Sequence, residues 1–224
     1  MLGADVRRVE RMAQRGEIPC QKVAGQFRFN RAEIGEWLQR QVGGMSREGL
    51  AEVDAGMTEQ REAGQDEPIV TPLLRPEAIA VDLDARTKQS VLKELVALAQ
   101  RTELVVDEQE LLGAVMYREE LCSTAIEGGI AIPHSRRPLP YAVVEPILVV
   151  ARTVQGIALG APDGRLTNLF FLTASLDDRH HLHLLARLCR MLRDDSFVAG
   201  LEEAGSVEQV IERMTARELE VLGK

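Results

Sequence analysis

The spacing of apolar residues at the start of the chain predicts one short helix. Val6, Val9 and Met12 recur at intervals of three residues, which places them on one face of an amphipathic helix. Gly16 marks the end of that helix, because glycine readily adopts the left-handed conformation with which many helices end.

A hairpin and a second helix are expected next. Two short runs of β-prone residues flank Ala24-Gly25, a pair suited to a tight turn between strands. Asn30 is a good N-cap for the helix that follows, with Glu33 three residues further on. The apolar stripe of that second helix consists of Ile34, Trp37 and Leu38.

Residues 45–69 differ in composition from what precedes and follows them. Gly, Glu, Gln, Ala and Asp dominate, and no apolar stripe is sustained. We therefore expect a flexible tether that acts as a passive spacer, in which residues 46–53 form at most a short helix. This divides the chain into an N-terminal segment of residues 1–44, a linker of residues 45–69 and a C-terminal domain of residues 70–224.

The C-terminal domain alternates strand-like and helix-like patterns. Strands are expected at residues 80–83, 130–133, 146–151 and 166–174. Helices are expected at residues 88–101, 107–119 and 178–193, with a last one beginning at Ser206. The two later strands are almost continuously apolar, as in a sheet covered on both faces. The predicted fold class is α/β, with a sheet flanked by helices on both faces and the small N-terminal segment in front of it.

The charge distribution supports two modules with different partners. The chain carries a net charge of −8, of which residues 1–44 hold +3 and the remainder −11. The three cysteines form neither a metal-ligand spacing nor a disulfide framework, which fits a reducing compartment. No apolar run approaches the roughly 20 residues that span a bilayer. We therefore expect a cytoplasmic protein without a membrane segment.

The candidate chemistry centres on residues 129–136, where an apolar strand leads to a proline and then to a histidine. Pro133 has no backbone N–H and cannot continue a sheet ladder, which predicts that His134 sits partly exposed at the end of the strand. Imidazole titrates near neutral pH, so its neutral form is available as a nitrogen nucleophile. The alternative is a loop histidine without a chemical role.

Several motifs around His134 occur in an order that resembles a known family. They are Tyr117-Arg118-Glu119-Glu120-Leu121, Ser123-Thr124-Ala125-Ile126-Glu127-Gly128-Gly129, Gly160-Ala161-Pro162-Asp163-Gly164 and Asp178-Arg179-His180-His181-Leu182. Over roughly residues 70–222 the chain resembles the enzyme IIA domain of the fructose–mannitol class of the bacterial phosphotransferase system (PTS), and its nitrogen-regulatory relatives. The resemblance implies the type-2 IIA sandwich, a mixed β-sheet between helices.

The resemblance also implies a role for each residue near the site. His134 would accept a phosphoryl group from a phosphorylated HPr-like carrier protein, which makes the protein a histidine phosphotransferase component. Arg118 would neutralise the phosphoryl oxygens, and His181 would donate a hydrogen bond to them. Ser135 stands where the family often has glycine, and its hydroxyl is a candidate further donor if its φ is negative. No metal and no cofactor is implied, because donor and acceptor are both protein histidines.

The same residues also allow interpretations in which they have no chemical role. His181 begins the core-facing stripe of its helix and could be a buried histidine without a chemical role, whereas His180 and His183 are expected to be exposed. A zinc site made from these histidines is disfavoured, because they lack the spacing that puts two imidazoles on one helix face. Arg118 could be a surface ion-pair partner of Glu119 or Glu120.

The N-terminal segment resembles the excisionase or MerR-like winged helix-turn-helix family. The resemblance rests on Arg15-Gly16-Glu17-Ile18-Pro19 and on residues 25–33. It implies a first helix in the DNA major groove and a hairpin on the DNA backbone. The basic residues expected to face DNA are Arg7, Arg8, Arg11, Lys22 and Arg28. The helix that usually precedes Leu2-Gly3 in this family is missing, so the segment looks truncated, and the alternative is a solvated arginine face on a packing helix.

Together the two resemblances imply a phosphoacceptor of a PTS-type relay. Its output is expected to be regulatory, in nitrogen or carbon signalling, and transcriptional through residues 1–44. The expected partners are an HPr-like carrier, DNA, and either an EIIB domain or a regulatory target protein. Two alternatives stay open, namely a sugar-transport EIIA that passes phosphate to an EIIB and a non-catalytic interaction module. The sugar, the regulatory target and the oligomeric state stay undetermined.

Overall fold

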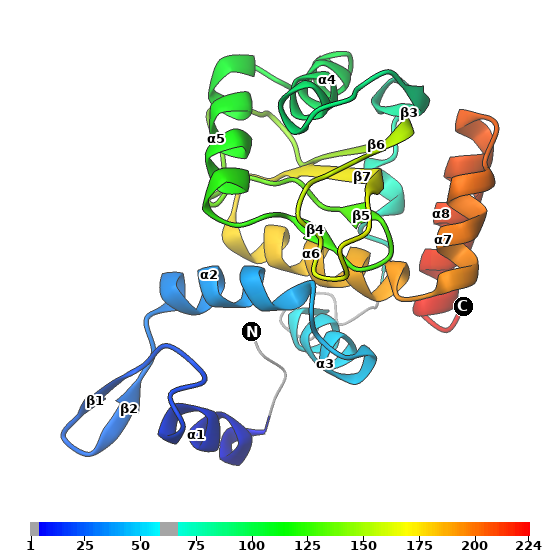
Figure 1. The fold of residues 1–224 in the computed structure, drawn as a ribbon. Helices are drawn as coiled ribbons and strands as arrows, with labels where there is room; N and C mark the ends of the chain where they lie inside the picture. Colours follow the sequence, from blue (N-terminus) through cyan, green and yellow to red (C-terminus); the bar gives the residue numbers. More distant parts are fainter. Residues whose placement is uncertain (1–4, 59–66) are drawn as a thin grey trace. The chain divides into compact units, whose positions relative to one another are not determined.

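The computed structural model describes residues 5–58 and 67–224, and the chain divides into two compact units. Unit 1 comprises the chain up to Asp66 together with Leu182–Arg190, and unit 2 comprises Glu67–His181 and Met191–Lys224. Figure 1 follows the elements along the chain. Residues 1–4, with which the predicted helix-turn-helix segment begins, and residues 59–66 of the expected tether lie outside the described residues.

Unit 1 begins with a hairpin between two helices. Its elements are α1 (Val6–Gln14), β1 (Gln21–Val23), β2 (Gln26–Arg28), α2 (Arg31–Val42) and α3 (Arg47–Thr58). A small core of Ala13, Ile18 and Ile34 holds α1 and α2 together, with partly buried apolar neighbours that include Trp37. The predicted helix, hairpin and second helix are confirmed.

The hairpin and the second helix begin where the sequence predicts them. Val23 pairs with Gln26, so the loop consists of Ala24 and Gly25 alone. Both have positive φ, at 48° and 82°, as a two-residue type I′ turn requires. At the start of α2 the Asn30 side chain accepts hydrogen bonds from the next backbone amides, which confirms the predicted cap.

The structure departs from the sequence-based expectation after residue 45. Residues 47–58 form helix α3 instead of a flexible tether. Leu50, Val53 and Met57 are all no more than 4% exposed. They recur at three- and four-residue intervals, which places them on one side of the helix. The polar residues between them concealed this stripe in the sequence.

Unit 2 is built on a five-stranded mixed sheet in the order β3-β6-β7-β5-β4. The strands are β3 (Ile79–Leu83), β4 (Ala125–Ile126), β5 (Ile130–Ala131), β6 (Ile147–Ile157) and β7 (Thr167–Ala174). β3 runs parallel to β6 and β5 runs parallel to β7, whereas the other neighbouring pairs are antiparallel. The predicted α/β fold class is confirmed.

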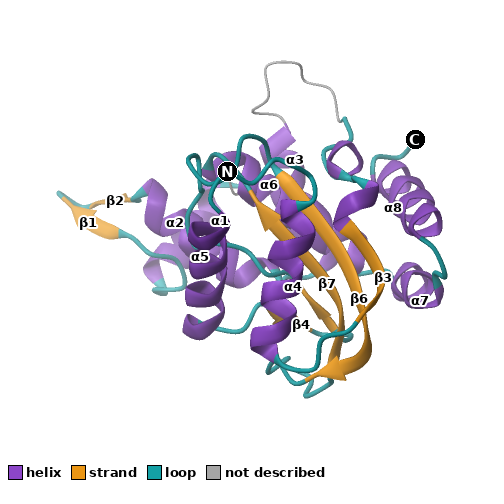
Figure 2. Ribbon diagram, turned by 90° about the horizontal axis from the view of Figure 1, so that it is seen from above, coloured by secondary structure: helices purple, strands orange, loops and turns teal. Residues whose placement is uncertain are grey.

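Helices flank this sheet. They are α4 (Lys88–Gln100), α5 (Glu108–Leu121), α6 (Asp178–Leu192), α7 (Asp195–Glu203) and α8 (Val207–Val221), with short 3₁₀ turns at Thr71–Leu73 and Pro76–Ala78. Figure 2 shows α4 and α5 on one side of the strands and α7 and α8 on the other. Strand β4 and helix α7 were not predicted from the sequence. No helix in the described part of the chain is both long and apolar enough to cross a bilayer.

The pairing of β6 with β7 sorts the apolar side chains between the two faces of the sheet. Val149 lies opposite Leu172, and Val150 lies opposite Phe171. Because successive strand residues point to opposite faces, these two pairs face opposite ways. Val149 and Leu172 join the core cluster that includes residues of α4 and α5. All four side chains are no more than 3% exposed, so both faces are covered, as their apolar sequences predict.

Candidate active site

The backbone around His134 is held by the neighbouring strand β7. The strand β5 ends at Ala131, and the carbonyl of Pro133 then accepts a hydrogen bond of 2.9 Å from the amide of Thr173. His134 itself forms an isolated parallel bridge with Thr173. The histidine was expected to be partly exposed, but it is only 4% exposed. Contacts with this distant part of the chain bury it.

The two ring nitrogens of His134 have different surroundings. Nδ1 lies 2.7 Å from the carbonyl oxygen of Ile132. Since a carbonyl oxygen can only accept, Nδ1 carries the proton of the neutral ring. Nε2 is buried and has no hydrogen-bond partner among the described residues. The lone pair therefore resides on Nε2, the nitrogen available to form a bond.

His181 faces His134 from the first turn of α6. Its ring centroid lies 5.2 Å from that of His134, and the ring planes are inclined by 51°. Asp177 caps α6 by accepting a hydrogen bond from the amide of His180, which fixes this turn. His181 is 1% exposed, and its Nε2 also lacks a partner among the described residues. The structure thus brings together the two histidines that the resemblance singled out.

Both rings are neutral near pH 7. Burial lowers the pKa of His134 well below its ordinary value, and the charges of His181 and Arg118 lower it further. Burial likewise lowers the pKa of His181 to about 4, with smaller contributions from His180 and Arg118. A neutral His134 retains its lone pair, as a nucleophile must.

Arg118 lies in the last turn of α5 and is buried rather than on the surface. It is 6% exposed, and its Nη1 donates a 2.6 Å hydrogen bond to the carbonyl of Cys122. Its positive charge acts on both histidines. The arrangement supplies a fixed cation beside two neutral imidazoles, which is suited to holding an anionic group.

Ser135 adopts no positive φ, so the serine fits the backbone where the family often has glycine. It is 2% exposed, and its hydroxyl donates a 2.6 Å hydrogen bond to the carbonyl of Arg137. In this state the hydroxyl stabilises its own loop, and it would have to turn to reach a phosphoryl group.

Glu119 positions the site, although its sequence context did not predict this role. The Glu119 carboxylate accepts hydrogen bonds of 2.8 Å and 2.5 Å from the amide and hydroxyl of Thr124, and pairs with Lys88 at 3.1 Å. These contacts fix the loop whose Cys122 carbonyl receives Arg118. The sequence shows Glu119 only as one of two adjacent acids, so only the fold distinguishes it.

The prediction that His183 is exposed is wrong. His183 is 4% exposed, and its Nε2 lies 3.0 Å from Oδ1 of Asp54 in α3. His181 and His183 are two residues apart, about 200° around the helix, and therefore contact different neighbours. The pattern could not reveal this, because the partner of His183 belongs to the stretch that was expected to be a tether.

The basic residues expected to face DNA are distributed over α1 and the hairpin. Arg7 and Arg11 are exposed and lie one helical turn apart. Arg8 is exposed too, but its Nη1 lies 2.6 Å from Oε2 of Glu52 in α3. Lys22 pairs across the hairpin with Phe27, and Arg28 pairs with Gln21. Because side chains alternate along a strand, Lys22 and Arg28 point to opposite faces of the hairpin.

Comparison with protein families decides the membership of the C-terminal part. Residues 72–216 match the family described as the phosphoenolpyruvate-dependent sugar phosphotransferase system, EIIA 2. This chain belongs to the EIIA type-2 family. Residues 1–42 match a helix-turn-helix domain. EIIA domains are phosphotransfer components, and they partner with HPr-like carriers and EIIB domains.

Relatives of this EIIA chain include both regulatory and sugar-specific proteins. A nitrogen regulatory protein of Bradyrhizobium diazoefficiens is 32% identical over 144 residues, which cover 63% of this chain and 91% of that protein. A fructose-specific EIIABC component of Bacillus subtilis is 29% identical over 145 residues, which cover 64% of this chain. The match spans only 22% of that longer protein.

Solved structures share the fold of the EIIA domain. The nitrogen regulatory protein IIA-Ntr of Neisseria meningitidis is similar with a TM-score of 0.60 at 24% identity, covering 66% of this chain and 99% of that one. The mannitol IIA of Escherichia coli gives a TM-score of 0.55 at 24% identity, covering 63% and 98%. A further similar structure is the complex of E. coli IIA mannitol with phosphorylated IIB, with a TM-score of 0.57 at 22% identity over 64% of this chain and 97% of that one.

Proposed function

We propose that this protein is a regulatory phosphoacceptor, in which Nε2 of His134 takes a phosphoryl group from a phosphorylated HPr-like carrier. The observation that carries the proposal is the hydrogen bond between Nδ1 of His134 and the Ile132 carbonyl. It leaves the lone pair on Nε2, opposite His181, with the charge of Arg118 acting on both rings.

The transfer step uses these groups in distinct ways. The Nε2 lone pair forms the new N–P bond while the bond between phosphorus and the carrier breaks, and that bond's electron pair leaves with the carrier. His134 keeps its Nδ1 proton, so its ring becomes positive, and the Ile132 carbonyl stabilises that charge. Arg118 and His181 hold the phosphoryl oxygens. Because phosphoryl transfer has a loose transition state, this alignment and charge compensation supply most of the catalysis.

A regulatory output is supported by two comparisons. Nitrogen regulatory proteins match this chain over most of their own length, and a helix-turn-helix domain matches residues 1–42. We assign to α1 and its exposed arginines contacts with DNA phosphates, and to the phosphoryl group the control of those contacts or of a protein target. Cys20, Cys122 and Cys189 form no disulfide, which is consistent with action in the reducing cytoplasm.

The test is intact mass after incubation with phosphoenolpyruvate, enzyme I and an HPr-type carrier. Wild type is expected to gain one phosphoryl group, and His134→Ala to gain none. His180→Gln serves as the matched control, since it removes a neighbouring histidine of the same helix without touching the acceptor, and it should still be phosphorylated. A wild-type protein that stays unmodified with every carrier would leave only a binding module.

The sugar-specific relatives favour a second candidate function, a transport EIIA that passes its phosphoryl group to an EIIB. Complementation of a transporter that lacks its own EIIA separates the two. Restored sugar uptake that depends on His134 would favour transport, and phosphorylation without restored uptake would favour regulation.

A further inference from the structure

Helix α3 carries two carboxylates that face in opposite directions. Glu52 and Asp54 are two residues apart, which separates them by about 200° around the helix. The Asp54 side chain is 1% exposed, whereas that of Glu52 is 42% exposed. One carboxylate is therefore part of a buried network and the other lies at the surface.

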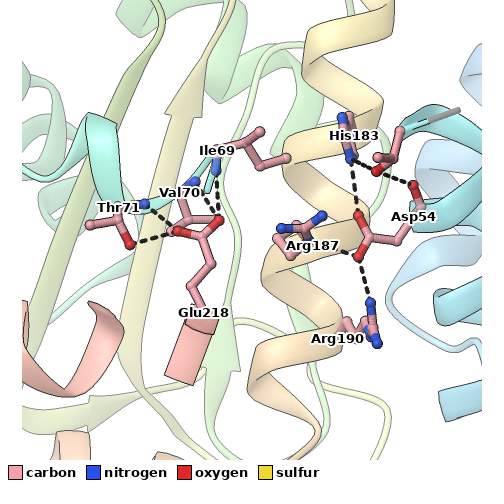
Figure 3. A network of polar contacts seen from close by, with 9 residues as sticks. Asp54, Ile69, Val70, Thr71, His183, Arg187, Arg190 and Glu218 are labelled. Atoms are coloured by element: carbon pink, nitrogen blue, oxygen red, sulfur yellow. Dashed lines mark hydrogen bonds and ion pairs between the residues drawn. The ribbon is translucent and has the colours of Figure 1, made fainter. Parts of the chain in front are cut away.

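The buried carboxylate anchors α3 to α6. Oδ2 of Asp54 accepts hydrogen bonds from Nε of Arg187 at 2.7 Å and from Nη1 of Arg190 at 2.9 Å, while Oδ1 lies 3.0 Å from Nε2 of His183 (Figure 3). The hydroxyl of Thr58 lies 3.3 Å from the same His183 nitrogen. Burial is the largest influence on the pKa of Asp54 and raises it. The contacts with His183 and Arg187 outweigh burial, so the pKa is lowered and the carboxylate stays ionised.

The surface carboxylate occupies one of the candidate DNA-binding arginines. Oε2 of Glu52 lies 2.6 Å from Nη1 of Arg8 in α1. Exposed ion pairs usually contribute little, partly because two long side chains must be ordered together. Here the Asp54 network already fixes the helix that carries Glu52. A carboxylate binds a guanidinium with the same geometry as a phosphate does, so Glu52 competes directly with DNA for Arg8.

We propose that α3 is an autoinhibitory latch, in which Glu52 withholds Arg8 from DNA phosphates while Asp54 anchors the helix to α6. The proposal rests on the DNA-binding part of the proposed function. It gives residues 47–58 an active role in place of a spacer, since duplex DNA must displace Glu52 before it gains the Arg8 contact.

The anchor of the latch and the candidate active site each use a histidine of helix α6. His183 contacts Asp54, and His181, two residues earlier in the same helix, faces His134. His181 and His183 thus both lie in the first two turns of α6. A change at the acceptor histidine that moves the first turns of α6 acts on the anchor of the latch.

The experiment measures binding of a fluorescently labelled DNA duplex of arbitrary sequence by anisotropy, at several KCl concentrations. Glu52→Gln is expected to bind roughly 3- to 10-fold more tightly than wild type, with a salt dependence steeper by about one unit, because one more phosphate contact forms. Glu48→Gln is the matched control. It removes the same charge from the same helix, and the Glu48 carboxylate interacts with Ser46 and Arg47 instead. It should stay within about twofold of wild type.

Two further variants identify the cause of the gain. Adding Arg8→Gln to Glu52→Gln should abolish the gain, and a gain that persists would overturn the latch in favour of a general charge effect. Equal affinities for Glu52→Gln and Glu48→Gln would also overturn it. If the latch is overturned, Arg11→Gln shows whether α1 nevertheless binds DNA. If it weakens binding of wild type, α1 binds DNA and only the latch is wrong. If it changes nothing, the DNA role of α1 fails together with the latch.

Discussion

At the scale of single residues, the backbone carbonyl of Ile132 determines which ring nitrogen of His134 keeps its lone pair. The carbonyl oxygen accepts a hydrogen bond from the Nδ1–H and thereby fixes the tautomer. Burial keeps a second proton off Nε2, and the neighbouring charges act in the same direction. As the proposed nucleophile, His134 would therefore need no general base to deprotonate it.

The first prediction concerns the protonation of His134. Because its pKa lies well below the ordinary value of about 6.5, the ring should stay neutral with its proton on Nδ1 from pH 8 down to pH 6. Nitrogen-15 NMR of the four histidine rings measures this directly, and His134→Ala assigns the signal. A His134 signal that titrates near pH 6.5 would contradict it.

The second prediction concerns stability in acid. The folded-state pKa of His181 is about 4, below the unfolded value of about 6.5. Between these values the unfolded state binds more protons, so stability falls as the pH falls. From pH 7.5 to 4.5 this amounts to about 2.5 kcal/mol for His181 alone.

Urea unfolding followed by circular dichroism tests this contribution. His181→Gln should lose less stability than wild type over that interval, by about the same 2.5 kcal/mol. Groups that His181 does not influence, Asp54 among them, affect both proteins alike. His181 also helps to lower the pKa of His134, and its removal relaxes that effect in the same direction. The difference between the two proteins is therefore the informative quantity. Parallel pH profiles for the two proteins would mean that His181 is not held neutral in the fold.

At the scale of elements, two buried carboxylates each hold a helix to a distant part of the chain. Asp54 ties α3 to α6, and Glu218 of α8 receives the chain at residues 69–71 (Figure 3). Glu218 is fully buried, and its oxygens accept four hydrogen bonds. The donors are the amides of Ile69, Val70 and Thr71 and the hydroxyl of Thr71.

The third prediction is that Asp54→Asn destabilises unit 1. The change removes the negative charge that compensates the fully buried Arg187, and breaking a buried ion pair costs about 3–5 kcal/mol. Trp37, the only tryptophan of the sequence, lies in unit 1 and reports its unfolding in urea. Glu48→Gln should change stability by less than about 0.5 kcal/mol. Similar effects of the two substitutions would show that the Asp54 network is not stabilising.

The fourth prediction concerns Glu218→Gln. The amide of glutamine keeps one oxygen but points a donor at groups that are themselves donors, which should cost about 2–3 kcal/mol of stability in unit 2. Hydrogen exchange at the amides of residues 69–71 should accelerate strongly, because these are the bonds lost. Glu220→Gln on the same helix, at a 64% exposed side chain, is the control. Unchanged exchange at residues 69–71 would contradict the assignment.

At the scale of the whole molecule, the proposed latch implies that phosphorylation and DNA binding influence each other reciprocally. If a phosphoryl group on His134 changes the affinity for DNA by some factor, bound DNA must change the phosphoryl equilibrium by the same factor. The fifth prediction is that phosphorylated and unphosphorylated wild type differ in duplex affinity, and that this difference is lost in Glu52→Gln. Anisotropy on both forms, with phosphoryl content checked by mass, measures it. A difference that survives in Glu52→Gln would require another route.

Elements that depend on local residue spacing could be predicted from the sequence. Features that depend on contacts with distant residues could not. The helices α1, α2 and α4 followed from apolar periodicity and caps, and the strands β6 and β7 from continuous apolar runs. Helix α3 escaped because Asp54 belongs to its buried side, and a buried aspartate is recognisable only once Arg187 is beside it. The burial of His134 depends in the same way on Thr173. The pairing of His134 with His181 came from the family resemblance, because no spacing joins them.

The hydrogen bonds between Glu218 and residues 69–71 bear on how proteins with an EIIA domain arise. The Glu218 carboxylate belongs to the last helix of unit 2 and closes over the first residues of the same unit. A gene segment that encodes both Glu218 and residues 69–71 carries both partners of this contact. Recombination can therefore move the segment without breaking the contact. Relatives in which the shared region is nearly the entire protein, and others in which it is about a fifth, are the outcome expected of such a mobile segment.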